Sequence, residues 1–269
     1  MRTPEHPDRV PRQDVPALFV PDGDHLVPTV YAVGPWRPDA LHGAAVAVLF
    51  AAALDRQEGT VARITLDMLA SVPLRPLCLD VTDELGGRRL QRRTAALRDG
   101  ERVVAQAHAV YVAESAVELP PAVGDVAGPP AQLAPLPDGR TGWPGFESRA
   151  VALHTGRAGE ASMAGWFRLL VPALAGGEVT GLQMALAAAD FTAGATSMVL
   201  SMKRYTFMSV DLTVNLARRP VGDWVGLVTG RAILGGGGVG VADSVLHDAE
   251  GPFGHCTQTQ FLRSLRRDG

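Results

Sequence analysis

The sequence is poor in three features that would each narrow the function at once: cysteine, excess positive charge and long apolar runs. Only two cysteines, Cys78 and Cys256, occur among the 269 residues, and neither stands in a CxxC or Cys/His spacing. The sequence therefore predicts no zinc site, no redox motif and no resident metal or cofactor. A reduced, cytoplasmic protein is the simplest expectation.

The charge balance is close to neutral, with 25 Lys plus Arg against 28 Asp plus Glu and a formal net charge of −3. No bulk positive field is available to collect nucleic acid or an anionic membrane, so neither is expected as a partner. The first fifteen residues are too charged and too rich in proline for a signal peptide, and no apolar run of about 18 residues follows. We expect a soluble chain with a flexible tail over residues 1–15.

The sequence does contain the same order of predicted elements, a helix followed by four strands, in each of its two halves. A stretch rich in Ala and Leu, HGAAVAVLFAAALDRQ, is apolar on all sides and predicts a buried central helix. Turn signals such as Gly86-Gly87 and Asp99-Gly100 then separate four β-like runs. These runs lie near residues 61–69, 77–85, 88–98 and 102–112.

The order returns after residues 116–147, a segment rich in Pro and Gly that predicts a linker. A β-like run, GWFRLLVPA, and a helix, EVTGLQMALAAADF, are followed by strand candidates near 207–219, 224–234, 240–248 and 253–263. At an offset of about 150 residues, LRDGERVVAQA matches LHDAEGPFGHC and ITLDMLASVP matches DLTVNLARRP in pattern.

The repeat predicts an α+β chain with an N-terminal unit over residues 16–115 and a C-terminal unit over 148–269. In each unit an antiparallel sheet would wrap round and bury its central helix, and the two units would join at their sheet edges. Two unrelated α+β modules are the alternative.

The motifs in this order resemble the acyl-CoA thioesterase II group and its thioesterase-like relatives, which are double hotdogs. In the first half the resemblance rests on GPW, LHG, ITLDML with its VPL turn, and LRDGERVVAQAHAVYV. In the second half it rests on ALAAADF, FMSVDLTVNLARRP, WVGL, GGGGVGVADSVLHDAEGPFG and TQTQFLR. The resemblance runs from about Gly34 to Arg263 and implies a double hotdog fold, commonly assembled further into a homo-oligomer.

Members of that family orient a hydrolytic water with an Asp that ends the second helix, a hydroxyl residue on the next strand and a Gln on the last strand. Carried over by position, these are Asp190, Ser209 and Gln258, with Ser209 standing where the thioesterase II pattern has Thr. A carboxylate, a hydroxyl and a carboxamide can together hold one water and take its proton. Without the resemblance, Asp190 would be read as an ordinary residue at a helix end and Gln258 as an outward residue of a strand.

Four further residues are candidates for substrate binding. His42 and Gly43 open the first helix, although a role in helix entry is the commoner explanation for His42. The oxyanion would most simply meet a backbone N–H near a helix N-terminus, and the sequence does not identify which one. Arg89 and Arg93 share one face of a strand and could pair with CoA phosphates, although a solvated basic edge strand is the commoner explanation.

Three functions follow. The first is hydrolysis of an acyl-CoA or acyl-carrier-protein thioester to free acid and thiol. The second is hydration or dehydration of an enoyl thioester, because Asp39 and His42 partly match the pattern of the hydratase branch of hotdog proteins. The third is binding of an acyl thioester without turnover.

Overall fold

The computed structural model describes residues 15–56, 59–84, 86–116, 145–154, 162–197 and 199–265. The first half contains β1 (Phe19–Asp22), β2 (His25–Pro28), the 3-10 helix η1 (Val30–Ala32), α1 (Gly43–Leu54), β3 (Thr60–Met68), β4 (Cys78–Glu84), β5 (Leu90–Asp99) and β6 (Arg102–Val112). The second half contains β7 (Phe146–His154), β8 (Ser162–Leu169), α2 (Gly181–Asp190), η2 (Phe191–Ala193), α3 (Gly194–Ser197), β9 (Tyr205–Ser209), β10 (Asp211–Leu216), β11 (Val225–Leu234), β12 (Val239–Asp248) and β13 (Gly251–Ser264).

The two predicted central helices are present as α1 and α2, and both are buried on nearly all sides. Nine of the twelve residues of α1 are buried, and every residue of α2 except Gly181 is buried. A helix that is apolar all round must be surrounded by protein, and here each helix contacts the other and the sheet. Each helix begins with a side-chain cap, since His42 accepts the N–H of Ala44 and Thr180 accepts that of Gln183.

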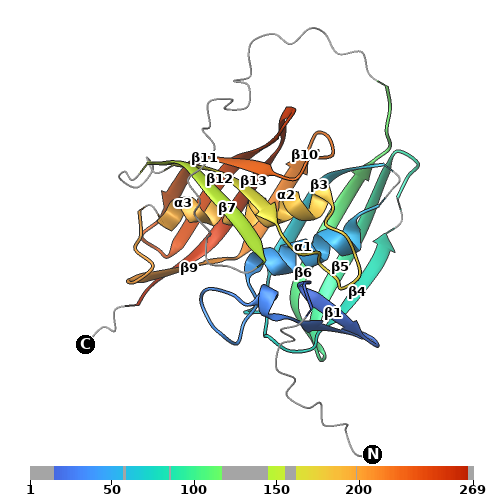
Figure 1. Cartoon of the computed structure of the whole chain (residues 1–269), viewed down its shortest axis with the longest axis horizontal. Coiled ribbons are helices and arrows are strands. Elements are labelled where there is room, and N and C mark those ends of the chain that lie inside the picture. Colours follow the sequence, from blue (N-terminus) through green and yellow to red (C-terminus); the bar gives the residue numbers. More distant parts are fainter. Residues whose placement is uncertain are drawn as a thin grey trace, which may run out of the picture.

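Of the strands in the described residues, all except β1 and β2 form one continuous sheet, where the sequence predicted two sheets joined at their edges; β1 and β2 pair with each other as a separate hairpin. Eleven strands take part, in the order β4-β5-β6-β3-β10-β13-β12-β11-β8-β7, with β9 paired to β13. The halves merge because β3 and β10 pair directly as antiparallel neighbours. Figure 1 shows the two helices on the inner side of this sheet, with strands of the first half on one side and strands of the second half on the other.

The repeated order of elements is confirmed by the sheet, because each half has the same strand sequence read outward from the junction. It is β3-β6-β5-β4 in the first half and β10-β13-β12-β11 in the second. At the junction Thr65 pairs with Thr213, 148 positions further along the chain. Leu66 pairs with Ala107 and Val214 with Cys256, so the spacing between equivalent residues is 148 to 149 on these strands. The halves are thus related by an approximate twofold axis that passes between the two threonines.

Some elements differ from the sequence-based expectation. The strand expected over 207–219 is two strands, β9 and β10, and at the break the Asp211 carboxylate accepts the N–H of Thr259 at 2.8 Å. The hairpin β1-β2 was not expected, and β7 begins at Phe146, near the end of the segment taken as a linker. The tail over residues 1–14 and most of that linker lie outside the described residues.

Within the described part of the chain, no helix combines the length and the apolarity needed to cross a bilayer.

Candidate active site

Asp190, Ser209 and Gln258 come from three elements of the second half and meet at one point. Asp190 is the last residue of α2, Ser209 the last residue of β9, and Gln258 lies in the middle of β13. Ser209 pairs with Gln260 in the sheet. Gln258, two positions away, shares the face of Gln260 and lies diagonal to Ser209, which aims both side chains at the end of α2.

The three side chains contact one another directly. The Gln258 amide donates from Nε2 to Oδ1 of Asp190 at 3.1 Å and to Oγ of Ser209 at 2.7 Å. The Ser209 hydroxyl lies 3.4 Å from the same Oδ1, as a long hydrogen bond. A carboxylate only accepts hydrogen bonds, so this arrangement fixes which end of the Gln258 amide faces Asp190.

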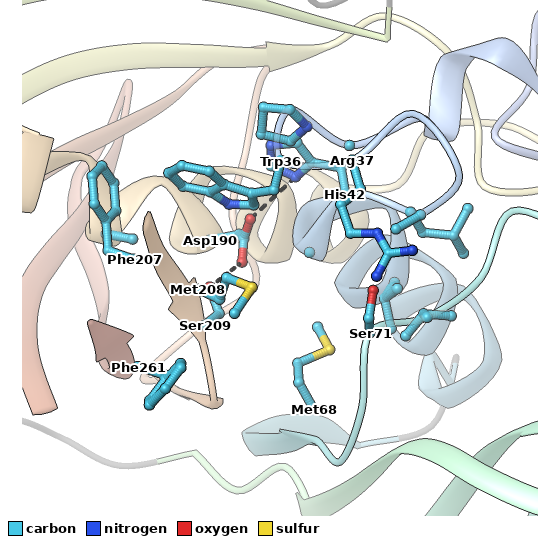
Figure 2. A pocket seen from close by; sticks show the side chains of 18 of the residues that line it. Trp36, Arg37, His42, Met68, Ser71, Asp190, Phe207, Met208, Ser209 and Phe261 are labelled. Carbon is cyan, nitrogen blue, oxygen red and sulfur yellow. Dashed lines mark hydrogen bonds and ion pairs between the residues drawn. The ribbon is translucent and has the colours of Figure 1, made fainter. Parts of the chain in front are cut away.

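His42 and Gly43 of the first half complete the site. Nδ1 of His42 lies 3.3 Å from Oδ2 of Asp190. A Cβ atom added to Gly43 would lie 2.7 Å from Oδ1 and 3.0 Å from Oδ2, a separation that real Cβ atoms do not show. The absence of a side chain at Gly43 therefore permits the N-terminus of α1 to approach the carboxylate. The site is shared between the halves, and Figure 2 shows His42 and Asp190 turned toward each other.

Burial controls the charge of His42. Loss of hydration lowers the pKa of its imidazole, and the opposing effect of Asp190 is smaller. His42 is therefore neutral at neutral pH, and its Nδ1 accepts the N–H of Ala44 at 3.0 Å. A neutral imidazole adds no positive charge beside the Asp190 carboxylate.

Asp190 opens onto a cavity of about 920 Å³. Its lining includes His42, Gly43, Asp190 and Ser209, together with a larger number of apolar side chains. The apolar members labelled in Figure 2 are Trp36, Met68, Phe207, Met208 and Phe261. Gln258 is fully buried and is not among the lining residues, so it supports Asp190 and Ser209 from beneath. Within the described structure its Oε1 has no hydrogen-bond partner.

The approximate twofold axis relates this cavity to a second one of about 80 Å³. In the second cavity Asp55 follows α1, and Thr180 and Gly181 begin α2. Thr180 and Gly181 correspond to His42 and Gly43, 138 positions earlier. At that spacing the counterpart of Asp190 is Ala52, and Asp55 lies three residues further along the chain. The offset of 148 positions found at the sheet junction relates further residues of the two linings. It matches Met68, Ser71 and Val72 of the large cavity with Leu216, Arg219 and Pro220 of the second.

The second cavity lacks the hydrogen-bonding groups of the first. Val61 lies where Ser209 lies, because it pairs with Tyr111 as Ser209 pairs with Gln260. The strand registers likewise place Ala109 where Gln258 lies. The Arg219 guanidinium fills the space and donates to Asp55 at 3.0 Å. Of these two cavities in the described part of the chain, the large one alone has the carboxylate, hydroxyl and carboxamide together.

The structure does not bring Arg89 or Arg93 to the large cavity. Arg93 donates to Asp83 at 2.7 Å and to the carbonyl of Ala53 near the C-terminal end of α1. His42 and Gly43 stand at the other end of this twelve-residue helix, about 18 Å away. Neither arginine lines the cavity. Arg93 lies on β5, next to the edge strand β4, and pairs there with the exposed Asp83, whereas Arg89 precedes β5.

Asp39 is also not placed to work with His42. Its carboxylate is 63% exposed and pairs with Arg37, whereas His42 is directed at Asp190. The pairing required for a hydratase is therefore not formed. The partnership of His42 with Asp190 was missed from the sequence, since no local spacing links residues on different halves. The GPW motif did mark the loop that brings Trp36 and Arg37 to the cavity.

The fold belongs to a known class. A conserved protein from Alicyclobacillus acidocaldarius, described as having a hot dog fold, superposes with a TM-score of 0.69 at 16% identity, covering 93% of this chain and 97% of that one. A Thermobifida fusca protein described by its sequence family as a thioesterase II gives a TM-score of 0.69 at 14% identity, with 92% of this chain and 96% of that one covered. The tesB protein of Mycobacterium avium subspecies paratuberculosis gives 0.62 at 16% identity, with 91% and 95% covered. The chain therefore has the hot dog fold.

Two family models match along the sequence. The acyl-CoA thioesterase N-terminal domain matches residues 32–112, and the acyl-CoA thioesterase C-terminal domain matches residues 118–262. No curated protein matches. The chain belongs to the acyl-CoA thioesterase family, and it is a thioester hydrolase.

Proposed function

We propose that this chain hydrolyses acyl-CoA thioesters to a free acid and a thiol through a water activated by Asp190. The observation that carries the proposal is the contact of the Asp190 carboxylate with Gln258, Ser209 and His42 at the wall of a mostly apolar cavity. Such a cavity suits an acyl chain, and a carboxylate held by the donors of Gln258 and Ser209 suits a general base. His42 adds no donor, because its Nδ1 accepts the N–H of Ala44.

In the proposed reaction Asp190 accepts a proton from water as the water oxygen attacks the thioester carbonyl carbon. The carbonyl electron pair moves onto oxygen and forms a tetrahedral oxyanion. When the oxyanion collapses, the bond from carbon to sulfur breaks and the sulfur leaves with the proton held by Asp190. Water is consumed, and the products are the acid and the thiol.

Gly43 supplies the donor for the oxyanion in this proposal. As the first residue of α1, it has an N–H with no acceptor inside the helix, at the positive end of the helix dipole. It also lies against Asp190, so one substrate carbonyl can meet the base and the donor together. Removing one oxyanion donor from an enzyme costs about 100-fold to 1,000-fold in kcat, which indicates the weight of this contact.

Gln258 and Ser209 have different parts in the mechanism. Gln258 lies behind the other two side chains and holds both with its two N–H groups, so we assign it a positioning role. Ser209 lines the cavity and receives one of those N–H groups, which leaves its own hydrogen free to turn toward water or Asp190. Asp190 and Ser209 would then hold the water.

The two repeated halves are, in this proposal, two hotdog units of one double hotdog. The domain limits, the cytoplasmic location and the homo-oligomer inferred from the sequence stay predictions. An acyl-carrier-protein thioester stays an alternative substrate.

The test is release of free thiol from acyl-CoA substrates of several chain lengths, comparing the unchanged protein with D190N. The variant keeps the size of the side chain but is a far weaker base, so we expect kcat to fall by about 100-fold to 10,000-fold. Circular dichroism and thermal unfolding serve as the control for folding. Undiminished turnover by folded D190N would contradict the proposal, as would conversion of crotonyl-CoA to a hydrated but intact thioester.

A further inference from the structure

The cavity has one strongly basic side chain at its opening. Of the described residues that line it, only Arg37 carries a permanent positive charge. The Arg37 side chain is 60% exposed, so it reaches both the cavity and the solvent. Figure 2 shows it directed toward Ser71, on the side of the cavity away from Phe207.

The loop that carries Arg37 is held in place at its base and near its tip. At the base, Val33 bridges to Leu41 and the N–H of Gly34 donates to the carbonyl of Ala40 at 2.9 Å. Near the tip, Trp36 packs edge-on against Phe207 of the second half, with ring centroids 4.9 Å apart. Arg37 is thereby fixed at the opening.

The present partner of Arg37 is one that a phosphate can replace. Its guanidinium donates to Asp39 at 2.9 Å and 2.5 Å. Both side chains are well exposed, and such surface pairs contribute little to stability. A phosphate offers the same forked geometry with more charge, and arginine binds it through two parallel hydrogen bonds.

We propose that Arg37 binds a phosphate group of the CoA moiety, in the role that the sequence suggested for Arg89 and Arg93. This inference rests on the proposed function. An acyl-CoA has an apolar acyl chain and a neutral pantetheine arm, which suit the cavity, and phosphates, which must stay near water. Arg37 stands where the apolar lining ends. The anionic end of the substrate is thereby bound by a loop of the first half, while the acyl group is cleaved at a carboxylate of the second.

The experiment compares R37Q with the unchanged protein on two substrates with the same acyl group. One is the CoA thioester and the other is the pantetheine thioester, which has no phosphate. We expect KM for the CoA thioester to rise about tenfold with little change in kcat, because one charge-assisted contact is lost. KM for the pantetheine thioester should stay the same. The variant D39N should lower KM for the CoA thioester, since it frees Arg37.

R75Q is the matched control. Arg75 is 62% exposed and pairs with Asp99, but it does not line the cavity. R75Q should leave both KM values unchanged. If R37Q raises KM equally for both substrates, or leaves both KM values unchanged, the inference is wrong. Either result is compatible with the proposed hydrolase, as long as the protein releases thiol. Absence of thiol release from either substrate by the unchanged protein would instead refute the proposed function.

Discussion

Thr65 and Thr213 face each other across the junction of the two halves, with their hydroxyl oxygens 3.1 Å apart. They are equivalent residues of the repeat, so the approximate twofold axis passes between them. The axis relates two cavities at equivalent places in the fold, each between the end of one central helix and the start of the other. One is open and equipped with hydrogen-bonding groups, and the other is nearly filled. The differences between them indicate which side chains make a working site.

Replacing Gly43 by alanine should damage catalysis without loss of stability. The new methyl group would come within 3.0 Å of the Asp190 carboxylate and displace it. Displacement of a catalytic group by about 1 Å can cost on the order of 100-fold in rate, so kcat should fall by roughly that factor. The contact at Gly43 is with the end of a side chain, which can shift, and not with backbone as at Gly181. Alanine is also a better helix former than glycine, so the thermal midpoint should not drop.

The matched control for this change is G181A at the start of α2. A Cβ there would meet the carbonyl oxygen of Pro220 at 2.8 Å, in the second cavity. G181A should therefore lower the thermal midpoint and leave kcat unchanged. Equal effects of the two variants on kcat would mean that Gly43 has no special relation to Asp190.

Replacing Gln258 by leucine should lower kcat more than it changes KM. The substitution removes both N–H groups that hold Asp190 and Ser209, while leucine fills similar space in a fully buried position. We expect kcat to fall by about tenfold to 100-fold, with the substrate cavity intact. The measurement is steady-state kinetics that determines kcat and KM separately. A change in KM alone would show that Gln258 contacts the substrate instead.

His42 should make the protein less stable in mild acid. Burial lowers the pKa of its imidazole below the value of 6.5 in the unfolded chain, so the unfolded state binds the proton more readily. Stability is full above about pH 6.5 and falls as the pH drops from there through the lowered pKa. His247, whose pKa burial also lowers, contributes with the same sign.

The variant H42N isolates the contribution of His42, because asparagine can still cap α1 but does not titrate. The free energy of unfolding, measured by urea titration between pH 5 and 8, should depend less on pH in H42N than in the unchanged protein. The part of the pH dependence of the unfolding free energy that is due to His247 should persist in both proteins. Identical pH dependence in the two proteins would show that His42 is not held neutral in the fold.

Opening the second cavity should not create a second active site. R219S removes the side chain that fills this cavity and pairs with Asp55, and it places there the serine found at the equivalent position 71. The variant loses the ion pair with the mostly buried Asp55 and the hydrogen bonds to the carbonyls of Arg56 and Gly59, so the thermal midpoint should fall. The double variant D190N/R219S should release no more thiol than D190N, because Val61 and Ala109 cannot hold a water. Recovered turnover in the double variant would show that Asp55 can also serve as a base.

Much of the architecture could be predicted because it is written in local patterns. The uniform apolarity of α1 and α2 predicted central helices, and the turns at Gly86-Gly87 and Asp99-Gly100 predicted the strands of the first half. Joining of the two units at their sheet edges was also predicted, but the strands that meet were not. No local signal marks the pairing of β3 with β10, because it joins residues about 148 positions apart.

The candidate site shows the same division. Asp190, Ser209 and Gln258 were suggested by resemblance, and the fold brings them into contact. Their relation to His42 could not be read, since the end of one helix meets the start of another through packing alone. The charge pattern of Arg89 and Arg93 was misleading. Alternation in a strand identifies which residues share a face, but it does not show whether that face lines a cavity or meets solvent.

The approach of Gly43 to Asp190 also links catalysis to assembly of the chain. In the proposed mechanism Gly43 of the first half supplies the oxyanion donor and Asp190 of the second half the base, so fragments 1–116 and 145–269 prepared apart should each be inert. When the two fragments are mixed, thiol release should return in proportion to the fraction of fragments in which β3 pairs with β10. Enzyme turnover would then report on the pairing of two strands, which makes this chain a ready system for fragment complementation.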